Sequence, residues 1–114
     1  MTPPADLRAA LAAAARLFDA ALYFEVHELL EPHWVVASGA TRHALQGVIQ
    51  IAVGWQHLAN GNLAGARSLL SDGAERLHGH TLGGIDFDSF ARAALEAAAA
   101  IPTAAPPTFP RATL

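Results

Sequence analysis

Apolar residues recur every three or four positions through most of the chain, a spacing that predicts helices rather than strands. The first stripe predicts a helix over residues 4 to 19 and consists of Leu7, Leu11, Ala14, Phe18 and Leu22. Thr2 precedes two prolines, which is typical of a helix start. After a joint at residues 19 to 22, a second helix is expected over residues 23 to 37. Pro32 lies inside it and predicts a kink or a tightened last turn.

A third helix is predicted over residues 42 to 60, with Ser38, Gly39 and Thr41 in the loop before it and Thr41 as its cap. It is apolar on nearly all sides, a pattern typical of a buried central helix. Gly47 and Gly54 lie two turns apart on one face of this helix. They predict that a neighbouring backbone approaches closely there.

The next segment, Asn60-Gly61-Asn62, indicates a helix stop followed by a helix start. It precedes a fourth helix at residues 63 to 78, a glycine-rich loop at residues 79 to 84, and a fifth helix that Asp86 or Asp88 caps. The inward faces of these two helices are expected to hold Leu63, Ala66, Leu69, Leu70, Ala74 and Leu77, and then Phe87, Phe90, Ala94, Leu95 and Ala98. The fold class is therefore all-α: a compact bundle of about five helices over residues 1–101, with an extended proline-rich tail at residues 102–114.

Composition narrows the class of protein. The 114 residues suffice for one domain with one core, and 53% of them are hydrophobic. Cysteine is absent, which removes disulfides and thiolate chemistry and fits a cytoplasmic, bacterial-type protein. The net charge is -3, and all seven basic residues are scattered arginines, so no nucleic-acid partner is expected. No uncharged apolar stretch of about 18 residues predicts a membrane span.

The segment YFEVHELLEPHW at residues 23 to 34 carries most of the candidate chemistry. At about 100° per residue, His27, Glu31 and Trp34 fall within one arc of the second helix, and Glu25 and Glu28 lie further round on the same side.

The third helix also carries a polar stripe. His43, Gln46, Gln50 and His57 share a stripe about 60° wide. If the two helices pack antiparallel, the arc and the stripe meet and form an interior cluster of carboxylates, imidazoles and amides.

Two interpretations of this cluster stay open. It is either a satisfied hydrogen-bond network that fixes helix register, or a site. As a site, His27 and Glu31 at i, i+4 would clamp one divalent metal ion with His57 opposite. Without a metal, Glu28 would act as general base beside His27.

Two known metal motifs do not fit. The HELLE segment has Glu31 where a zinc protease needs its second histidine. A ferritin-like di-iron centre needs Glu-x-x-His on each of two helices and is not predicted. His78 and His80 flank a glycine and are expected in a solvated loop.

Several motifs resemble one family. They are Phe24 to Glu31 followed by Trp34, the run LQGVIQIA at residues 45 to 52, then His57, Gly61-Asn62, Gly65-Ala66 and Leu69-Leu70. In order and spacing they resemble domain-of-unknown-function family 309, over roughly residues 18 to 88. The resemblance implies an all-helical bundle of about five helices and no established activity. It also implies that Glu25, His27, Glu28, Trp34, Gln46, Gln50 and His57 belong to one constellation.

The resemblance includes two departures. A glycine is usual just before the aromatic pair, where this chain has Ala21-Leu22, and an ordinary helix former is usual at Pro32.

The function favoured by the sequence is a non-enzymatic module that binds a small ligand or a protein, with no cofactor. The alternative is a divalent-metal-binding protein, including a metal-dependent hydrolase. Because Trp55 lies opposite the glutamine stripe and several helix faces are alanine-rich, a homodimer is a further expectation.

Overall fold

The computed structural model describes the backbone of residues 4–112 and the side chains of residues 7–112. Within this range the elements are α1 (Pro4–Asp19), α2 (Tyr23–Val36), α3 (Gly39–Ala59), α4 (Leu63–Leu77), β1 (Thr81–Leu82), β2 (Ile85–Asp86) and α5 (Asp88–Ala100). The predicted all-α class is confirmed. The expected cap Thr2 lies outside the described residues.

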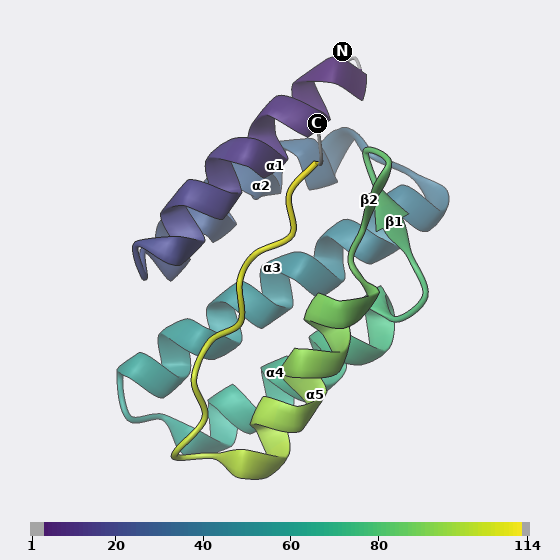
Figure 1. Cartoon of the computed structure of the whole chain (residues 1–114). Coiled ribbons are helices and arrows are strands. Elements are labelled where there is room, and N and C mark those ends of the chain that lie inside the picture. The colour runs from purple at the N-terminus through teal and green to yellow at the C-terminus, as the bar shows by residue number, and fades with distance from the viewer. Residues whose placement is uncertain (1–3, 113–114) are drawn as a thin grey trace.

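Helix α3 is the central element, as its apolar surround predicts. It packs against α2 on one flank and α4 on the other, while α1 covers α2 and α5 covers α4. Figure 1 shows α3 running diagonally through the middle of the molecule, with α1 and α2 above it and α4 and α5 below. Short connections make α2 and α3 an antiparallel pair.

The same turn motif closes α1 and α3. At the end of α3, Gly61 has φ +80° and the N–H of Asn62 reaches back to the carbonyl of His57, 2.8 Å away. At the end of α1, the N–H of Leu22 reaches the carbonyl of Leu17 at 2.9 Å, and the residue in the left-handed position is Ala21, with φ +61°. This motif ordinarily places glycine there because a Cβ is strained at positive φ.

The connection between α2 and α3 is shorter than predicted. Helix α2 continues through Pro32, and its last turn is tightened, since the N–H of Ala37 donates to the carbonyls of both His33 and Trp34. Helix α3 begins at Gly39, so the prediction that Thr41 caps it is wrong, and Thr41 lies inside its first turn. Ser38 stands at the cap position without a side-chain hydrogen bond.

Glycines hold α3 and α4 close together, as Gly47 and Gly54 predict. A Cβ built on Gly47 would lie 2.8 Å from the carbonyl oxygen of Gly73, and one built on Gly73 would lie 2.7 Å from that of Gly47. A Cβ on Gly54 would meet the Leu70 side chain at 2.9 Å. The side chain of Asn62 accepts from the N–H of Gly65 at 3.0 Å and caps α4, also as predicted.

The glycine-rich segment after α4 is a hairpin rather than a plain loop. Strands β1 and β2 pair antiparallel, with Leu82 opposite Ile85. Gly83 and Gly84 have φ +56° and +78°, the backbone that a two-residue hairpin turn requires. Asp86 accepts from the N–H of Asp88 at 2.8 Å and so closes the start of α5.

The core is built from both halves of the chain and contains no polar residue among those described. Most residues of the predicted apolar stripes are buried, but five are not. Leu22, Leu63 and Leu95 are 42%, 38% and 56% exposed, and Leu7 and Leu69 are half-buried. Within the described residues, no helix has the length and apolar character needed to cross a membrane.

The segment after α5 turns back and runs along the bundle toward α1 (Figure 1). Its Phe109 is 1% exposed and packs against the rings of Phe18, Phe87 and Phe90. The sequence pattern did not single out Phe109.

Candidate interaction surface on helices α2 and α3

The predicted polar cluster lies at the surface, so the expectation that it is interior is wrong. Its three carboxylates, on Glu25, Glu28 and Glu31, are exposed. The other members of the predicted set are half-buried, namely His27, Trp34, Gln46, Gln50 and His57, and His43 on the same stripe is exposed.

The rotation of α3 explains the difference. Gln46 and Trp55 are nine residues apart, about two and a half turns, and so point in opposite directions. The structure buries Trp55, which is 2% exposed, and therefore turns the glutamine stripe toward solvent between α2 and α4. This arrangement leaves the carboxylates hydrated, which avoids the cost of burying them. Oε1 of Gln50, in contrast, is closed off from solvent and has no hydrogen-bond partner among the described residues. It also removes Trp55 as a surface for self-association.

His27 links the predicted residues of α2. Its Nε2 lies 3.6 Å from Oε1 of Glu31 one turn later, and its ring lies 5.5 Å from that of Phe24. Its Nδ1 is closed off from solvent and has no hydrogen-bond partner among the described residues.

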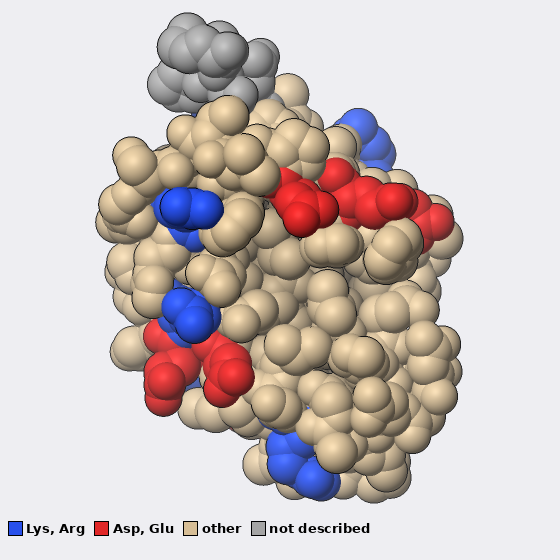
Figure 2. Space-filling view, turned by 180° about the vertical axis from the view of Figure 1, so that it is seen from behind, with Lys and Arg blue, Asp and Glu red and all other residues tan. Residues whose placement is uncertain are grey.

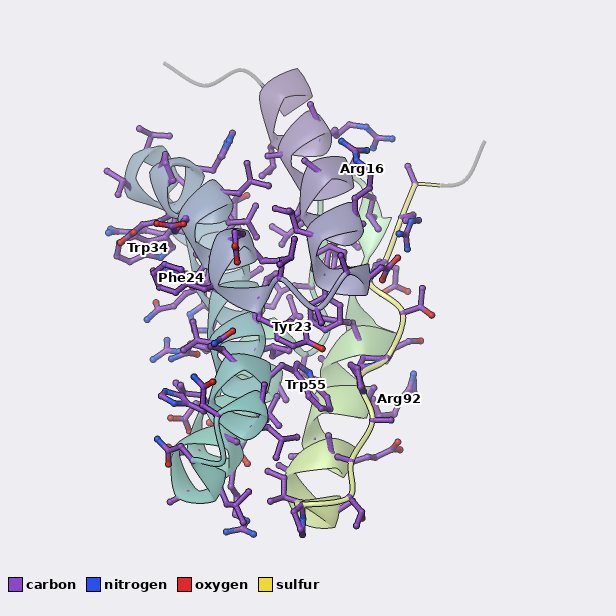
Figure 3. All side chains as sticks on the ribbon, turned by 90° about the vertical axis from the view of Figure 1, so that its left-hand side faces the viewer. Arg16, Tyr23, Phe24, Trp34, Trp55 and Arg92 are labelled. Carbon is purple, nitrogen blue, oxygen red and sulfur yellow. The ribbon has the colours of Figure 1, made fainter. Side chains whose placement is uncertain are left out.

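Trp34 joins the far end of α2 to the start of α3. The guanidinium carbon of Arg42 lies 4.1 Å from the centre of the Trp34 ring. Figure 3 shows Phe24 and Trp34 projecting on the same side of the molecule, whereas Tyr23 and Trp55 lie further inside, between the helices. The two ends of α2 thus present aromatic rings on one side.

His57 does not join His27 and Glu31. Its Nδ1 lies 3.2 Å from the side-chain nitrogen of Asn62, at the C-terminal end of α3. Trp34 meets Arg42 across the antiparallel pair, and this contact fixes the register of the two helices. In that register His27 stands opposite about residue 49 of α3. His57 is then about 12 Å further along α3. Among the described residues, no group of three histidine, aspartate or glutamate side chains is placed to hold a metal ion.

The charge of α2 is unusual within the chain. The sequence holds ten acidic residues and seven arginines. Three of the ten acidic residues, and no arginine, lie on α2, so the remaining seven balance the seven arginines and α2 carries the whole net charge of -3. Figure 2 shows a row of acidic side chains across the upper right of the face seen from behind, and a second acidic group beside basic side chains at the lower left. Within the described residues, Glu25 and Glu28 form no ion pair.

Apolar side chains accompany these carboxylates. Phe24 is 51% and Val35 is 59% exposed. Phe24, Glu28, Glu31 and Val35 are spaced four, three and four residues apart, and therefore lie within one arc about 60° wide. We call these four residues the outer face of α2. Their spacing is that of a coiled-coil seam.

A second cluster, which the sequence did not predict, joins α4 to α5. Asp88 accepts from the N–H of Gly79 at 3.0 Å, and its carboxylate lies 3.1 Å from His78 Nδ1 and 3.8 Å from Arg92. These residues border a groove of about 420 Å³ that also touches Leu95. The contacts fix the start of α5 against the end of α4. The signal available in the sequence was Asp88 four residues before Arg92, a spacing that pairs charges on one helix face.

The family model "Domain of unknown function (DUF309)" matches residues 11–69 of the chain. The chain belongs to this family. A crystal structure of a conserved hypothetical protein from Thermus thermophilus is similar to it with a TM-score of 0.66 and 36% sequence identity, covering 77% of this chain and 94% of the other. No curated protein matches the chain. The DUF309 match agrees with the motifs of the sequence analysis, and neither name carries an activity or a ligand.

Proposed function

We propose that this DUF309 chain is a non-enzymatic protein-interaction module that binds a basic, amphipathic helix along the outer face of α2. The carrying observation is the half-exposed Phe24 on the one helix that holds the chain's entire net negative charge. The proposal treats the chain as a cytoplasmic protein, which its lack of cysteine favours.

The order of residues on the outer face specifies the partner. Phe24 and Val35 are apolar and stand at the two ends, while Glu28 and Glu31 stand between them. A helix that packs against a seam of this spacing offers residues at the same three- and four-residue intervals. The complementary pattern is apolar, basic, basic, apolar. Aromatic residues are frequent anchors of such interfaces, and charge complementarity chiefly sets specificity and association rate.

The same charges argue against a second copy of the chain on this face. Two α2 helices packed face to face would bring six carboxylates together with no arginine from either helix, and like charges at an interface are unfavourable.

The metal-binding alternative has less support. His27 and Glu31 offer two ligands 3.6 Å apart, but His57 is directed to Asn62 at the other end of α3. A catalytic metal centre ordinarily needs three protein ligands. The outer face of α2 needs no rearrangement to bind, so we favour the interaction module.

The experiment uses a designed helical peptide as the probe, with leucine, lysine, lysine and leucine at the seam positions and a fluorescent label. We expect fluorescence anisotropy to show binding to the wild-type chain that weakens as salt rises, because the contact is partly electrostatic. A peptide with glutamate in place of both lysines is expected to show no binding.

Matched variants test whether the peptide binds the outer face of α2 rather than any exposed acidic or apolar side chain. Phe24→Ser and Glu28→Gln should each weaken binding by about fivefold or more, the loss that follows from a contact of about 1 kcal/mol. Leu95→Ser and Glu96→Gln remove the same kinds of side chain from α5, where Leu95 is 56% exposed, and should leave the affinity unchanged. Equal losses in the α2 and α5 variants would reject the proposal.

A further inference from the structure

The segment that follows α5 is held by side chains rather than by its backbone. Between Ala104 and Ala112 it belongs to no helix or strand. The last backbone hydrogen bond among the described residues joins the N–H of Thr103 to the carbonyl of Ala100, at 3.0 Å. Prolines at 106, 107 and 110 have no N–H to donate. The segment therefore lies on the bundle like a bound peptide.

Two residues anchor the segment. The Phe109 ring is enclosed by three others, with centroids 5.5 Å from Phe18, 5.6 Å from Phe87 and 5.1 Å from Phe90. Two residues later, Arg111 forms an ion pair with Asp19 at the end of α1, and both side chains stay partly exposed. The anchors thus combine one buried aromatic ring with one solvated charge pair.

Space remains beside the segment on both sides of these anchors. A pocket of about 300 Å³, open to solvent, is bordered by Pro110 and by Arg8 and Arg16 of α1. Another, of about 340 Å³, lies between Pro106 and Tyr23. The segment therefore lies at the surface of the bundle, with a pocket open to solvent on each side of its anchors.

We infer that the groove between α1, the hairpin and α5 is a recognition site for an extended segment with an aromatic residue, proline and arginine in succession. In this structure the chain's own Phe109-Pro110-Arg111 fills it. The occupant that competes for it is the same segment of a second copy, which brings identical contacts. Such an exchange breaks one aromatic contact set and one exposed ion pair, and requires no unfolding of the helices.

The intramolecular segment has the advantage of its tether. A short flexible connection holds it at an effective concentration of order millimolar. Exchange between copies is therefore expected only when the chain concentration approaches that range, or when an anchor of the tethered segment is weakened.

The test measures binding of a fluorescein-labelled peptide, AAPPTFPRA, which copies residues 104 to 112. The full-length wild type should bind it weakly. Full-length Phe109→Ala, whose own segment has lost its anchor, should bind at least about tenfold more tightly, because the tethered competitor is removed. The peptide with alanine in place of phenylalanine should bind neither chain.

A second variant keeps the inference testable if Phe109→Ala fails to fold by circular dichroism. Arg111→Ala leaves the aromatic anchor in place and should bind the peptide about threefold more tightly than wild type, as expected for loss of one exposed pair. Adding Asp19→Asn to Arg111→Ala should reverse that gain, since the peptide then loses its arginine contact. Failure of the peptide to bind either variant would overturn the recognition site.

Sedimentation equilibrium tests whether the segment of a second copy occupies the groove. Wild type near millimolar concentration should contain dimer, and Phe109→Ala at the same concentration should contain less. Peptide binding without dimer in the wild type would overturn the assignment to a second copy.

Discussion

The guanidinium carbon of Arg42 lies 4.1 Å from the centre of the Trp34 ring, so the first turn of α3 is fastened to the last turn of α2. This contact fixes which residues of the antiparallel pair stand opposite one another. It also places an arginine at one end of the acidic helix while leaving the outer face of α2 uncovered.

Replacing Arg42 should weaken this fastening only slightly. We expect Arg42→Ala to lower the free energy of unfolding by about 0.5–1 kcal/mol, the usual contribution of an exposed cation–aromatic contact. Urea denaturation measures the change, with Arg67→Ala on the exposed side of α4 as the control. An equal loss in both variants would mean that the contact contributes nothing.

A glycine in the turn between α1 and α2 is expected to stabilise the folded chain. Ala21 has φ +61°, in the same motif that uses Gly61 after α3. Ala21→Gly should raise the free energy of unfolding by about 0.5–1 kcal/mol, because relief of the left-handed strain exceeds the entropy that glycine adds to the unfolded chain. Ala20→Gly, one residue earlier, should stabilise nothing. Destabilisation by Ala21→Gly would show that the strain is absent.

The close crossing of α3 and α4 should not tolerate a methyl group. In Gly73→Ala the new Cβ would lie 2.7 Å from the carbonyl oxygen of Gly47, an atom fixed in a helix. Overpacking of this kind costs about 1–3 kcal/mol and outweighs the gain in helix propensity. Thermal unfolding should show a lower Tm than for Ser68→Ala, which adds propensity at an exposed position of the same helix. A Tm at or above that of the control would contradict the close contact.

Tyr23 gives the chain a stability change at high pH. Burial raises the pKa of its phenol above the ordinary 10.0, because the anion is poorly solvated. The folded state therefore holds this proton more tightly than the unfolded state. The stabilising contribution is complete below pH 10 and is lost as the pH rises through the folded pKa.

Tyr23→Phe isolates this effect. Relative to the variant, the wild type should keep its unfolding free energy up to pH 10.0 and lose it as the pH rises further, through the raised folded pKa. Tyr23 is the only tyrosine in the chain, so absorbance of the phenolate follows its titration directly. Identical pH dependence of the two proteins would contradict the raised pKa.

The helices were predicted well, because apolar stripes, caps and turns depend on residues that lie close together in the sequence. Gly61 and Asn62 end α3 and start α4 in the predicted way. The hairpin turn also had a local signal, since Gly83-Gly84 between Leu82 and Ile85 is a typical two-residue turn. The prediction of a glycine-rich loop at residues 79 to 84 overlooked this turn.

The direction in which the polar stripe faces could not be predicted from residues close in the sequence. Periodicity shows that Gln46 and Trp55 point in opposite directions, but not which of them faces the core. That choice depends on how α1 and α5 cover the bundle, and the structure buries Trp55. Phe109 was missed for a related reason, since a single aromatic residue among prolines has no period and its partners lie as far away as Phe18.

The most direct test of the proposed interaction surface is an amide-by-amide nuclear magnetic resonance titration of the full chain with the lysine–leucine peptide. The account predicts that the largest shifts fall on α2, between Phe24 and Val36, and that Glu28→Gln reduces them while Glu96→Gln does not. Shifts centred on the groove beside His78 and Leu95, or shifts that leave α2 unchanged, would contradict it.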